Sequence, residues 1–334
     1  MKVVMVNDCA YVGETLIKYL PKNFFIQHLK RSGGFFDKTL GIAWKIFRTK
    51  GDIYHIHYLL QECWLALKLG KRPVLGHAHG SDIRDSIKHF AWGRIVRHNL
   101  KRCDKIVVST PNLLEKAKEF NETAEYIPNL VDEGIFYPKI RQKRANGKIN
   151  LLIASSSDWK VKRTDKIIKA LKMIENDVEV YMIRYGVDVD KTLRLAKTLN
   201  LHVNVLPPVP RNLLPNYYWN ADTVIAAIGV GGTLGMVALE AIACGRPVVT
   251  RVSSQFPEYR DFPLLDISTP EEIAEAILSS RSEDLWKKEY HYFRLHHDPK
   301  KVTEKFMKIY HCLLYTSDAA DEGLGVDLGG RRII

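Results

Sequence analysis

Residues 222–250 read DTVIAAIGVGGTLGMVALEAIACGRPVVT, and this stretch decides the fold. Its apolar beginning ends at Gly229, which predicts a buried strand, and the glycines that follow let the backbone turn sharply. Thr233 is suited to cap a helix that runs to Cys244, and Gly245 then marks the end of that helix. A strand, a glycine-rich turn and a helix in this order indicate a unit of a parallel α/β sheet.

The same stretch has nearly the length of a transmembrane helix, because residues 223–239 carry no charge. Four glycines interrupt it, so a strand, a turn and a helix are favoured over a membrane span. A soluble or peripheral protein is therefore expected.

The glycine-rich turn opens a helix, and free N–H groups together with the helix dipole make such a place suited to phosphate. Glu240 is the acidic residue of this otherwise apolar helix, so its burial costs free energy unless it has a partner. It could accept hydrogen bonds from sugar or ribose hydroxyls, or pair with a neighbouring Lys or Arg, and the segment alone leaves both open.

On both sides of this stretch, short apolar runs alternate with segments whose apolar residues have helical spacing. This pattern in both halves of the chain predicts two α/β domains with parallel sheets and a cleft between them. Strands are expected at 2–6, 24–27, 53–57, 74–78, 105–109, 125–127, 150–154, 178–183, 202–205, 223–227 and 247–250. Helices are expected at 12–20, 35–48, 61–69, 87–102, 112–120, 164–175, 189–199, 211–219, 235–244, 270–280 and 301–314.

The alternation stops at the basic segment KIRQKRANGK, residues 139–148, which is typical of a linker. We therefore expect an N-terminal Rossmann-like domain over 1–140, a linker over 141–148 and a second domain over 149–298. A helix over 299–314 would pack back on the first domain. The glycine-rich residues 315–334 show no strand or helix period and are interpreted as a non-native or disordered tail.

Composition narrows the class of protein. The 334 residues contain 46% hydrophobic and 26% charged side chains, which excludes a disordered or collagen-like chain. The 50 basic and 38 acidic residues leave a net charge of +12, which favours an anionic partner. Five scattered cysteines without a CxxC pair, and an N-terminus without a secretory signal, favour a reducing cytoplasmic compartment.

A second candidate site is SSSDWKVKRTD, residues 155–165, directly after a predicted strand. Its serines, Lys162 and Arg163 could hold a diphosphate at the start of the next helix. The alternative is a solvated basic helix start.

In the first half, HAHGSDIR (residues 77–84) follows the fourth strand, where parallel sheets gather their ligands. Ser81 and Asp82 could equally be helix caps. The pairs at His55/His57 and His77/His79 could each present two imidazoles on one strand face, but no carboxylate or cysteine completes a set, so no metal is expected. Gly13 lies in a turn before a helix and is a weak phosphate-loop signal.

Five motifs together resemble family-4 retaining glycosyltransferases of the GT-B fold, the glycosyl transferases group 1. They are HAHGSDIR at 77–84, CDKIVVSTP at 103–111, IPNLVD at 127–132 with FYP at 136–138, KRTD at 162–165 and LEAIACGRPVV at 239–249. The resemblance covers residues 1–314, and its last motif is the most specific.

The resemblance implies roles for individual positions. Lys162, with Arg163 and Ser157, would bind the donor diphosphate, and Glu240 would accept hydrogen bonds from the ribose. Backbone N–H groups of Thr233, Leu234 and Gly235 would lie nearby, His79 would lie beside the transferred sugar, and Gly13 would allow close approach of donor or acceptor. Acceptor-side candidates are His77, Ser81, Asp82 and Arg84. The family needs no metal and no cofactor, because a helix dipole and basic side chains neutralise the leaving diphosphate.

Two positions depart from the family pattern. The family has a glutamate eight positions before Glu240, where this chain has Gly232. Arg163 replaces the glycine that usually follows the lysine at 162. We interpret the first departure as altered donor contacts, and an inactive homologue is the alternative.

The expected function is transfer of a hexose-type sugar from a UDP- or GDP-linked donor to a hydroxyl of a glycan or lipid-linked glycan, with retention. One alternative is a GT-B sugar-nucleotide epimerase, which needs acid and base carboxylates. The other is a non-enzymatic nucleic-acid or anion binder, although no nucleic-acid motif is present and the lysines are dispersed.

Residues 18–50 carry eight of the basic side chains and one acid, interleaved with aromatic residues. This mixture suits an anionic lipid interface, so peripheral binding to the cytoplasmic membrane face is expected. Phe24 and Phe25 fall on a predicted strand and are assigned to the core.

Overall fold

The computed structural model describes residues 1–31, 34, 40–140, 147–229 and 231–325, with side chains up to Tyr315 other than that of Glu283. The chain forms two compact units. Unit 1 contains Met1–Asn129 and Pro299–Ile334, and unit 2 contains Leu130–Asp298. The predicted linker falls largely outside the described residues, as does the start of the helix predicted at 35–48.

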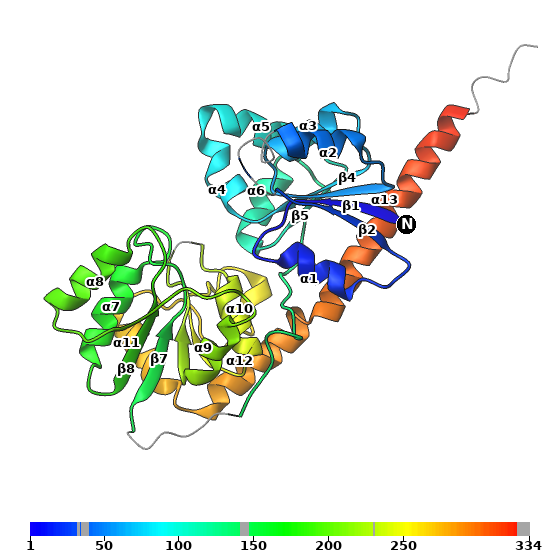
Figure 1. Cartoon of the computed structure of the whole chain (residues 1–334). Coiled ribbons are helices and arrows are strands. Elements are labelled where there is room, and N and C mark those ends of the chain that lie inside the picture. The colour runs from blue at the N-terminus through cyan, green and yellow to red at the C-terminus, as the bar shows by residue number, and fades with distance from the viewer. Residues whose placement is uncertain (32–33, 35–39, 141–146, 230, 326–334) are drawn as a thin grey trace, which may run out of the picture. The chain divides into compact units, whose positions relative to one another are not determined.

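Unit 1 is built on a six-stranded parallel sheet in the order β2-β1-β3-β4-β5-β6 (Figure 1). Its strands are β1 (Lys2–Val6), β2 (Phe25–Leu29), β3 (Ile53–His57), β4 (Val74–Ala78), β5 (Lys105–Val108) and β6 (Glu125–Tyr126). Its helices are α1 (Val12–Tyr19), α2 (Ile42–Arg48), α3 (Gln61–Lys68), α4 (Ser81–Arg84), α5 (Phe90–Arg102), α6 (Leu114–Lys118) and α13 (Pro299–Gly325), with the 3-10 turns η2 (Ser86–Lys88) and η3 (Pro111–Leu113).

The two faces of this sheet differ in chemistry. One face is apolar and packs against α2, α3 and α5 through side chains such as Val4, Ile56 and Ile106. The other face carries His55 and His57 of β3, and α13 covers it with Phe306 and Tyr310. The period of two along a strand separates these sets.

Unit 2 has a five-stranded parallel sheet in the order β11-β10-β7-β8-β9. Its strands are β7 (Ile149–Ile153), β8 (Val178–Ile183), β9 (Asn204–Leu206), β10 (Thr223–Ile225) and β11 (Val248–Val249). Its helices are α7 (Thr164–Met173), α8 (Val189–Thr198), α9 (Leu214–Asn220), α10 (Met236–Ala243), α11 (Pro270–Ser279) and α12 (Glu283–His296), with the 3-10 turn η4 (Pro257–Tyr259).

Both faces of the second sheet are apolar. One core packs α7 and α11 against residues such as Leu151 and Ile225, and the other packs α9, α10 and α12 against residues such as Leu152 and Val224. Two α/β units with parallel sheets confirm the predicted fold class.

Several predicted boundaries differ from the structure. The first segment of unit 1 ends at Asn129, earlier than residue 140, because Val131 and Phe136 are buried in the core of unit 2. The helix α12 was not predicted, because its charged and aromatic residues obscure its apolar stripe. The helix α13 belongs to unit 1 and continues to Gly325, so the region taken as an irregular tail begins as helix.

The uncharged run at 223–239 is resolved as β10, a turn and the start of α10, as predicted. Within the described part of the chain, no helix combines the length and the hydropathy that a membrane crossing requires.

Candidate functional site

The two loops that the sequence favoured for phosphate lie side by side in unit 2. One follows β7 and the other follows β10, and the Ile228 N–H donates to the Lys162 carbonyl oxygen at 3.2 Å. A Cβ built on Gly229 would lie 1.6 Å from the Val161 carbonyl oxygen, so no side chain fits there. The glycine is therefore required because the two backbones touch.

The helix α10 follows the loop after β10 and begins at Met236. Its N-cap is Gly235, an exposed residue with extended backbone (φ −90°, ψ 167°), no side-chain cap and no acidic residue in the first turn. The predicted N-cap at Thr233 is wrong, because the helix starts three residues later. The Leu234 N–H, one of the expected donors, already donates to the Tyr259 hydroxyl at 3.3 Å.

Glu240 of α10 is 6% exposed and has two polar neighbours. The Tyr218 hydroxyl donates to Oε2 at 3.2 Å, and Arg211 Nε lies 3.7 Å from Oε1. Burial raises the pKa of Glu240 to about 7, although Arg211 and the Tyr218 hydroxyl both act in the opposite direction. The ion pair considered from sequence is thus present, and its partner Arg211 was missed because it lies far away in sequence.

The loop after β7 positions its residues in different ways. Ser157 is fully buried; its Oγ lies 3.7 Å from Met182 Sδ, and its backbone is bonded to Tyr185 and Asp188. Its hydroxyl therefore points away from any ligand at the loop surface. Lys162 is half-buried at the end of the loop, next to the contact with Ile228.

Arg163 caps α7 in the left-handed conformation (φ 57°, ψ 40°) that glycine adopts readily. Its guanidinium donates to both carboxylate oxygens of Asp165, at 3.2 and 3.1 Å. Arg163 thus adopts a backbone conformation that favours glycine.

Gly232 has a φ of 54°, and its carbonyl oxygen accepts the Ser253 N–H at 2.9 Å. A Cβ there would lie 2.7 Å from the Ser253 Cβ. A glutamate at this position would require the loop to move.

In unit 1, the turn between β1 and α1 is closed by its own carboxylate. Asp8 accepts the N–H groups of Gly13 at 2.8 Å and Glu14 at 3.0 Å. A Cβ on Gly13 would lie 3.0 Å from Met5 Sδ and 3.1 Å from His57 Nε2. Gly13 therefore permits close approach of the chain itself, and its N–H already donates to Asp8.

Four histidines gather on one face of the sheet, at the ends of β3 and β4. His55 Nε2 lies 3.1 Å from His77 Nδ1, His57 Nδ1 lies 2.8 Å from His79 Nε2, and His55 Nδ1 lies 2.7 Å from the Tyr310 hydroxyl. Burial lowers the pKa of all four, that of His57 to about 4.

Three of these side chains, His55, His57 and His77, each offer a nitrogen within 4.8 Å of the others, and they form the one such metal-compatible group among the described residues. Because these rings stack on one another and their nitrogens are mostly bonded within the cluster, the arrangement is that of a neutral packed network.

The remaining acceptor-side candidates, Ser81, Asp82 and Arg84, differ in their surroundings. Asp82 is fully buried, and its carboxylate accepts the N–H groups of Gly80 and Ile83, both at 3.0 Å, so it organises the loop. Ser81 is exposed at the start of α4, and Arg84 lies at the end of α4 with Asp85 at 3.6 Å.

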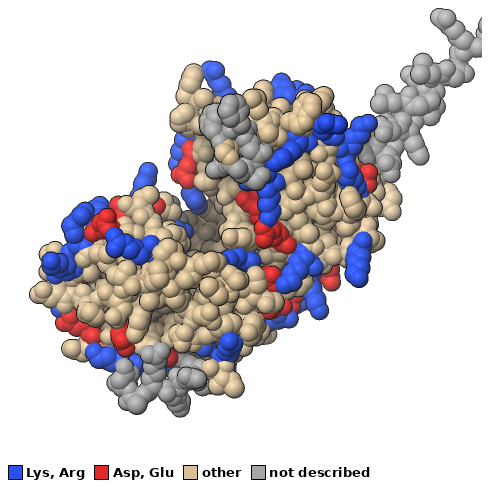
Figure 2. All heavy atoms as spheres, viewed as in Figure 1, with Lys and Arg blue, Asp and Glu red and all other residues tan. Residues whose placement is uncertain are grey.

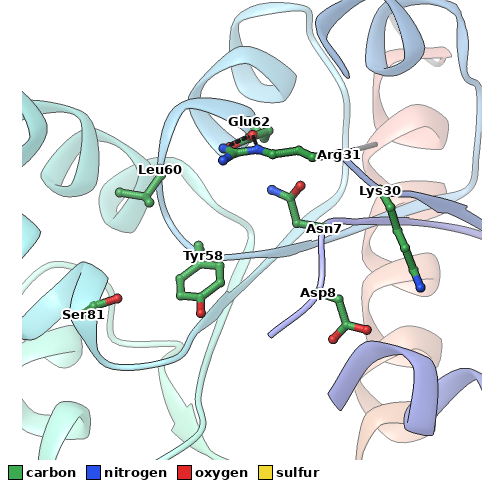
Figure 3. A pocket seen from close by; sticks show the side chains of 8 residues that line it. All are labelled: Asn7, Asp8, Lys30, Arg31, Tyr58, Leu60, Glu62 and Ser81. Carbon is green, nitrogen blue, oxygen red and sulfur yellow. Dashed lines mark hydrogen bonds and ion pairs between the residues drawn. The ribbon is translucent and has the colours of Figure 1, made fainter. Parts of the chain in front are cut away.

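Ser81 lines a cavity of about 440 Å³ above the ends of β1, β2 and β3 (Figure 3). In Figure 3, Arg31 reaches across the cavity to Glu62, with which it forms an ion pair, while Asp8 points toward α1. Tyr58 lies below, and its hydroxyl donates to Cys9 Sγ at 2.8 Å. Asp8, Tyr58 and Arg31 were not predicted, although each follows a strand end.

Structural comparisons agree with this architecture. The chain superimposes on sucrose-phosphate synthase from Thermosynechococcus elongatus with a TM-score of 0.74 at 14% identity, covering 95% of this chain and 100% of that one. It superimposes on Anabaena Alr3699/HepE in complex with UDP and glucose with a TM-score of 0.73 at 13% identity, covering 94% and 100%.

Sequence comparisons find two curated relatives. The first, 25% identical over 217 residues, is N-acetyl-alpha-D-glucosaminyl L-malate synthase of Bacillus anthracis, covering 60% of this chain and 57% of that protein. The second, 27% identical over 214 residues, is GDP-mannose-dependent alpha-(1-6)-phosphatidylinositol monomannoside mannosyltransferase of Mycolicibacterium smegmatis (strain ATCC 700084 / mc(2)155), covering 58% and 56%. The matches thus span little more than half of either relative.

The two parallel-sheet units and their structural neighbours define the GT-B fold. Residues 137–291 match the family described as glycosyl transferases group 1, the family that the sequence motifs resemble. The resemblance read from the sequence motifs is confirmed.

Proposed function

We propose that this protein transfers a hexose-type sugar from a nucleoside-diphosphate donor to a hydroxyl of a glycan or lipid-linked glycan, with retention of configuration. The observation that carries the proposal is the junction in unit 2, where the Lys162 loop touches the β10 loop beside the uncapped start of α10. A loop that carries a cation and a helix N-terminus thus adjoin the same β10 loop, which suits a diphosphate. Structural neighbours of this chain were solved with UDP or UDP-glucose bound, which supports a nucleotide-sugar donor.

In this proposal Lys162 neutralises charge on the leaving diphosphate, and the start of α10 at Gly235 faces the same charge. The leaving phosphate takes the proton of the acceptor hydroxyl, and Glu240 accepts a hydrogen bond from the ribose. Unit 1 binds the acceptor, with His79 beside the transferred sugar. No metal or other cofactor takes part.

The test is release of nucleotide from UDP- and GDP-sugars in the presence of glycan acceptors, measured with and without EDTA. We expect one donor class to be consumed, with the same rate in EDTA. Donor-dependent thermal stabilisation provides a separate measure of binding. Absence of both turnover and binding with every donor would reject the proposal.

The two alternative functions are not favoured. An epimerase needs a further acid or base, and the position eight before Glu240 is a glycine closed in by Ser253. NMR analysis of the product separates isomerisation from transfer. A nucleic-acid binder would show steep, salt-sensitive binding to RNA or DNA, which we do not expect.

We also propose that the protein binds an anionic membrane surface on the cytoplasmic side through residues 18–50. The support comes from α2, where Trp44 and Phe47 are exposed and the Arg48 guanidinium lies 5.5 Å from the Trp44 ring. Figure 2 shows a row of basic side chains over this part of unit 1. Phe24 is core, as expected, whereas Phe25 is largely exposed, which corrects its assignment.

A further inference from the structure

A second cavity of unit 1, of about 430 Å³, shares no lining residue with the one at Ser81. It is enclosed by η2 and α4 on one side, by α5 on another, and by η3 and α6 on the third. We call it the basic cavity. It shares no residue with the loops of unit 2 described above.

The basic cavity is lined by four cations and by no acid among its described lining residues. The cations are Arg84, Lys88, Arg97 and Lys116. Arg97 is fixed by a hydrogen bond from Nη1 to the Ile87 carbonyl oxygen at 3.0 Å, so its charge has a defined place. A single amide, Asn112, adds a further polar group.

Two acids near the rim offset part of this charge. Asp85 lies 3.6 Å from Arg84, and Glu119 pairs with Lys116 on the surface. The four cations against these two acids leave an excess of two positive charges. Lys101, outside the lining, has its Nζ 5.9 Å from the centroid of the Phe120 ring that borders the cavity. The site is therefore complementary to an anion.

Apolar side chains form the rest of the lining. Ile83, Ile87 and Leu113 are buried under the cations, and the Phe120 ring borders the cavity with Lys116 Nζ 5.4 Å from its centroid. These apolar side chains would not stabilise an inorganic anion. They would stabilise the first methylene groups of an acyl chain or of a glycerol backbone, which leave water on contact.

Two exposed aromatic residues lie at the start of α5, directly after Lys88 of the basic cavity. Phe90 is 76% exposed and Trp92 is 40% exposed, and the Arg94 guanidinium lies 4.4 Å from the Phe90 ring. Exposed aromatic rings beside cations are typical of segments that enter the headgroup region of a bilayer.

We propose that the basic cavity binds the phosphate headgroup of an anionic membrane lipid, while Phe90 and Trp92 insert beside it. The phosphate lies among Arg84, Lys88 and Lys116, and the glycerol and first methylene groups contact the apolar floor. This site is separate from the α2 surface and does not depend on the proposed glycosyl transfer.

The test is co-sedimentation with phosphatidylcholine vesicles, with or without phosphatidylglycerol, at low salt. The double variant Lys88→Glu/Lys116→Glu should weaken binding to the anionic vesicles at least about 30-fold, because each basic residue near such a surface contributes about a factor of five or more. Phe90→Ser should weaken it about 10-fold, because one aromatic side chain no longer leaves water.

Two further variants carry matched charge changes. Lys169→Glu/Lys197→Glu alters exposed lysines of α7 and α8 in unit 2 and should bind as the wild type does. Lys45→Glu/Arg48→Glu alters α2 and measures the other surface. Equal binding by the basic-cavity variant and the unit 2 variant would overturn the proposal, as would complete loss of binding in the α2 variant alone.

A titration with inorganic phosphate, followed by thermal shift, distinguishes a lipid from a soluble anion. Stabilisation by phosphate that the cavity variant loses, without any binding to vesicles, would overturn the lipid assignment. The donor-dependent thermal shift of the same variants reports separately on unit 2, so failure of the proposed transfer and failure of this site give different results.

Discussion

Two helix starts in this chain, α1 of unit 1 and α10 of unit 2, follow parallel strands but are completed in different ways. The start of α1 is filled by the Asp8 carboxylate, which accepts the N–H groups of Gly13 and Glu14. The start of α10 has no side-chain cap and no acid in its first turn. The helix dipole favours negative charge at both places, and only at α1 does the chain supply it. The comparison shows why unit 2 is the side on which we place the donor diphosphate.

The largest expected effect concerns Lys162, whose loop contacts the β10 loop that leads to α10. Lys162→Ala should lower kcat/KM about 100- to 1,000-fold, because charge on the leaving diphosphate loses its stabilisation. Nucleotide release with the preferred donor measures this. Lys169→Ala, on an exposed position of α7, is the control and should stay near wild type. A Lys162 variant with full activity would remove the basis for placing the diphosphate in unit 2.

The second prediction contrasts the acid response of the two units. Burial depresses the pKa of His57 to about 4, so the stability it contributes is present above pH 6.5 and is lost as the pH falls toward 4. The loss amounts to about 3 kcal/mol over this range. Glu240 has the opposite sign: its pKa is raised to about 7, so its contribution is present below pH 4.5 and is lost as the pH rises through 7.

Amide hydrogen exchange at pH 7.5 and pH 5 resolves this contrast by location. Protection of β3 and β4 should fall at pH 5 in the wild type and fall less in His57→Gln, whose amide cannot take up a proton. Unchanged protection of these strands, or an equal fall in the variant, would contradict the neutral histidine network.

The third prediction tests the contact between the two loops of unit 2. Gly229→Ala places a Cβ against the Val161 carbonyl and should cost about 1–3 kcal/mol of stability, since the loops must separate. It should also weaken donor binding, because Lys162 moves with its loop. Gly235→Ala meets no atom within 4 Å and should lose about 0.5 kcal/mol as a cap. Similar stabilities of the two variants, measured by urea unfolding, would argue against the close contact.

How far the sequence predicts this molecule depends on the range of the interactions. The strands and the turn at 222–250 follow from local chemistry, and β10, Gly229 and α10 appear where the sequence places them. The pairing of Glu240 with Arg211 joins residues that are far apart in the chain, so only the fold reveals it. The N-cap was misplaced because Thr233 has the right chemistry but the turn continues to Gly235.

In unit 1 as well, the contacts that the sequence does not predict are those set by the fold. The two His-x-His pairs were visible, but their joining into one network needs the β3–β4 register, in which His57 lies opposite His77. The sequence predicts a Gly13 that is open to a ligand, because nothing in it shows that the Asp8 carboxylate accepts the Gly13 N–H.

The fourth prediction concerns a substitution that removes the difference between the starts of α1 and α10. Asp8→Ala should cost about 1–2 kcal/mol, because two N–H groups lose their acceptor. Inorganic phosphate should then restore part of this stability, as it can occupy the vacated start of α1. Thr269→Ala removes the cap of α11, whose first turn carries two acids where that of α1 carries one, and should lose similar stability without rescue. Rescue of both variants, or of neither, would show that Asp8 does not stand in for a bound anion.

The smallest effect concerns Arg163, which holds a left-handed backbone at the position where the family has glycine. Arg163→Gly removes the strain of a side chain at φ 57° but also the partly exposed pair with Asp165, and it adds freedom to the unfolded chain. We expect a net gain of about 0.5 kcal/mol, since left-handed strain costs about 1–2 kcal/mol and an exposed pair contributes about 0.5 kcal/mol. Arg163→Ala keeps the strain and loses the pair, so it should be about 1 kcal/mol less stable than Arg163→Gly in urea unfolding. If the two variants were equally stable, the turn at the start of α7 would have relaxed away from the left-handed conformation, and the lysine beside it would no longer be held by a glycine-like turn.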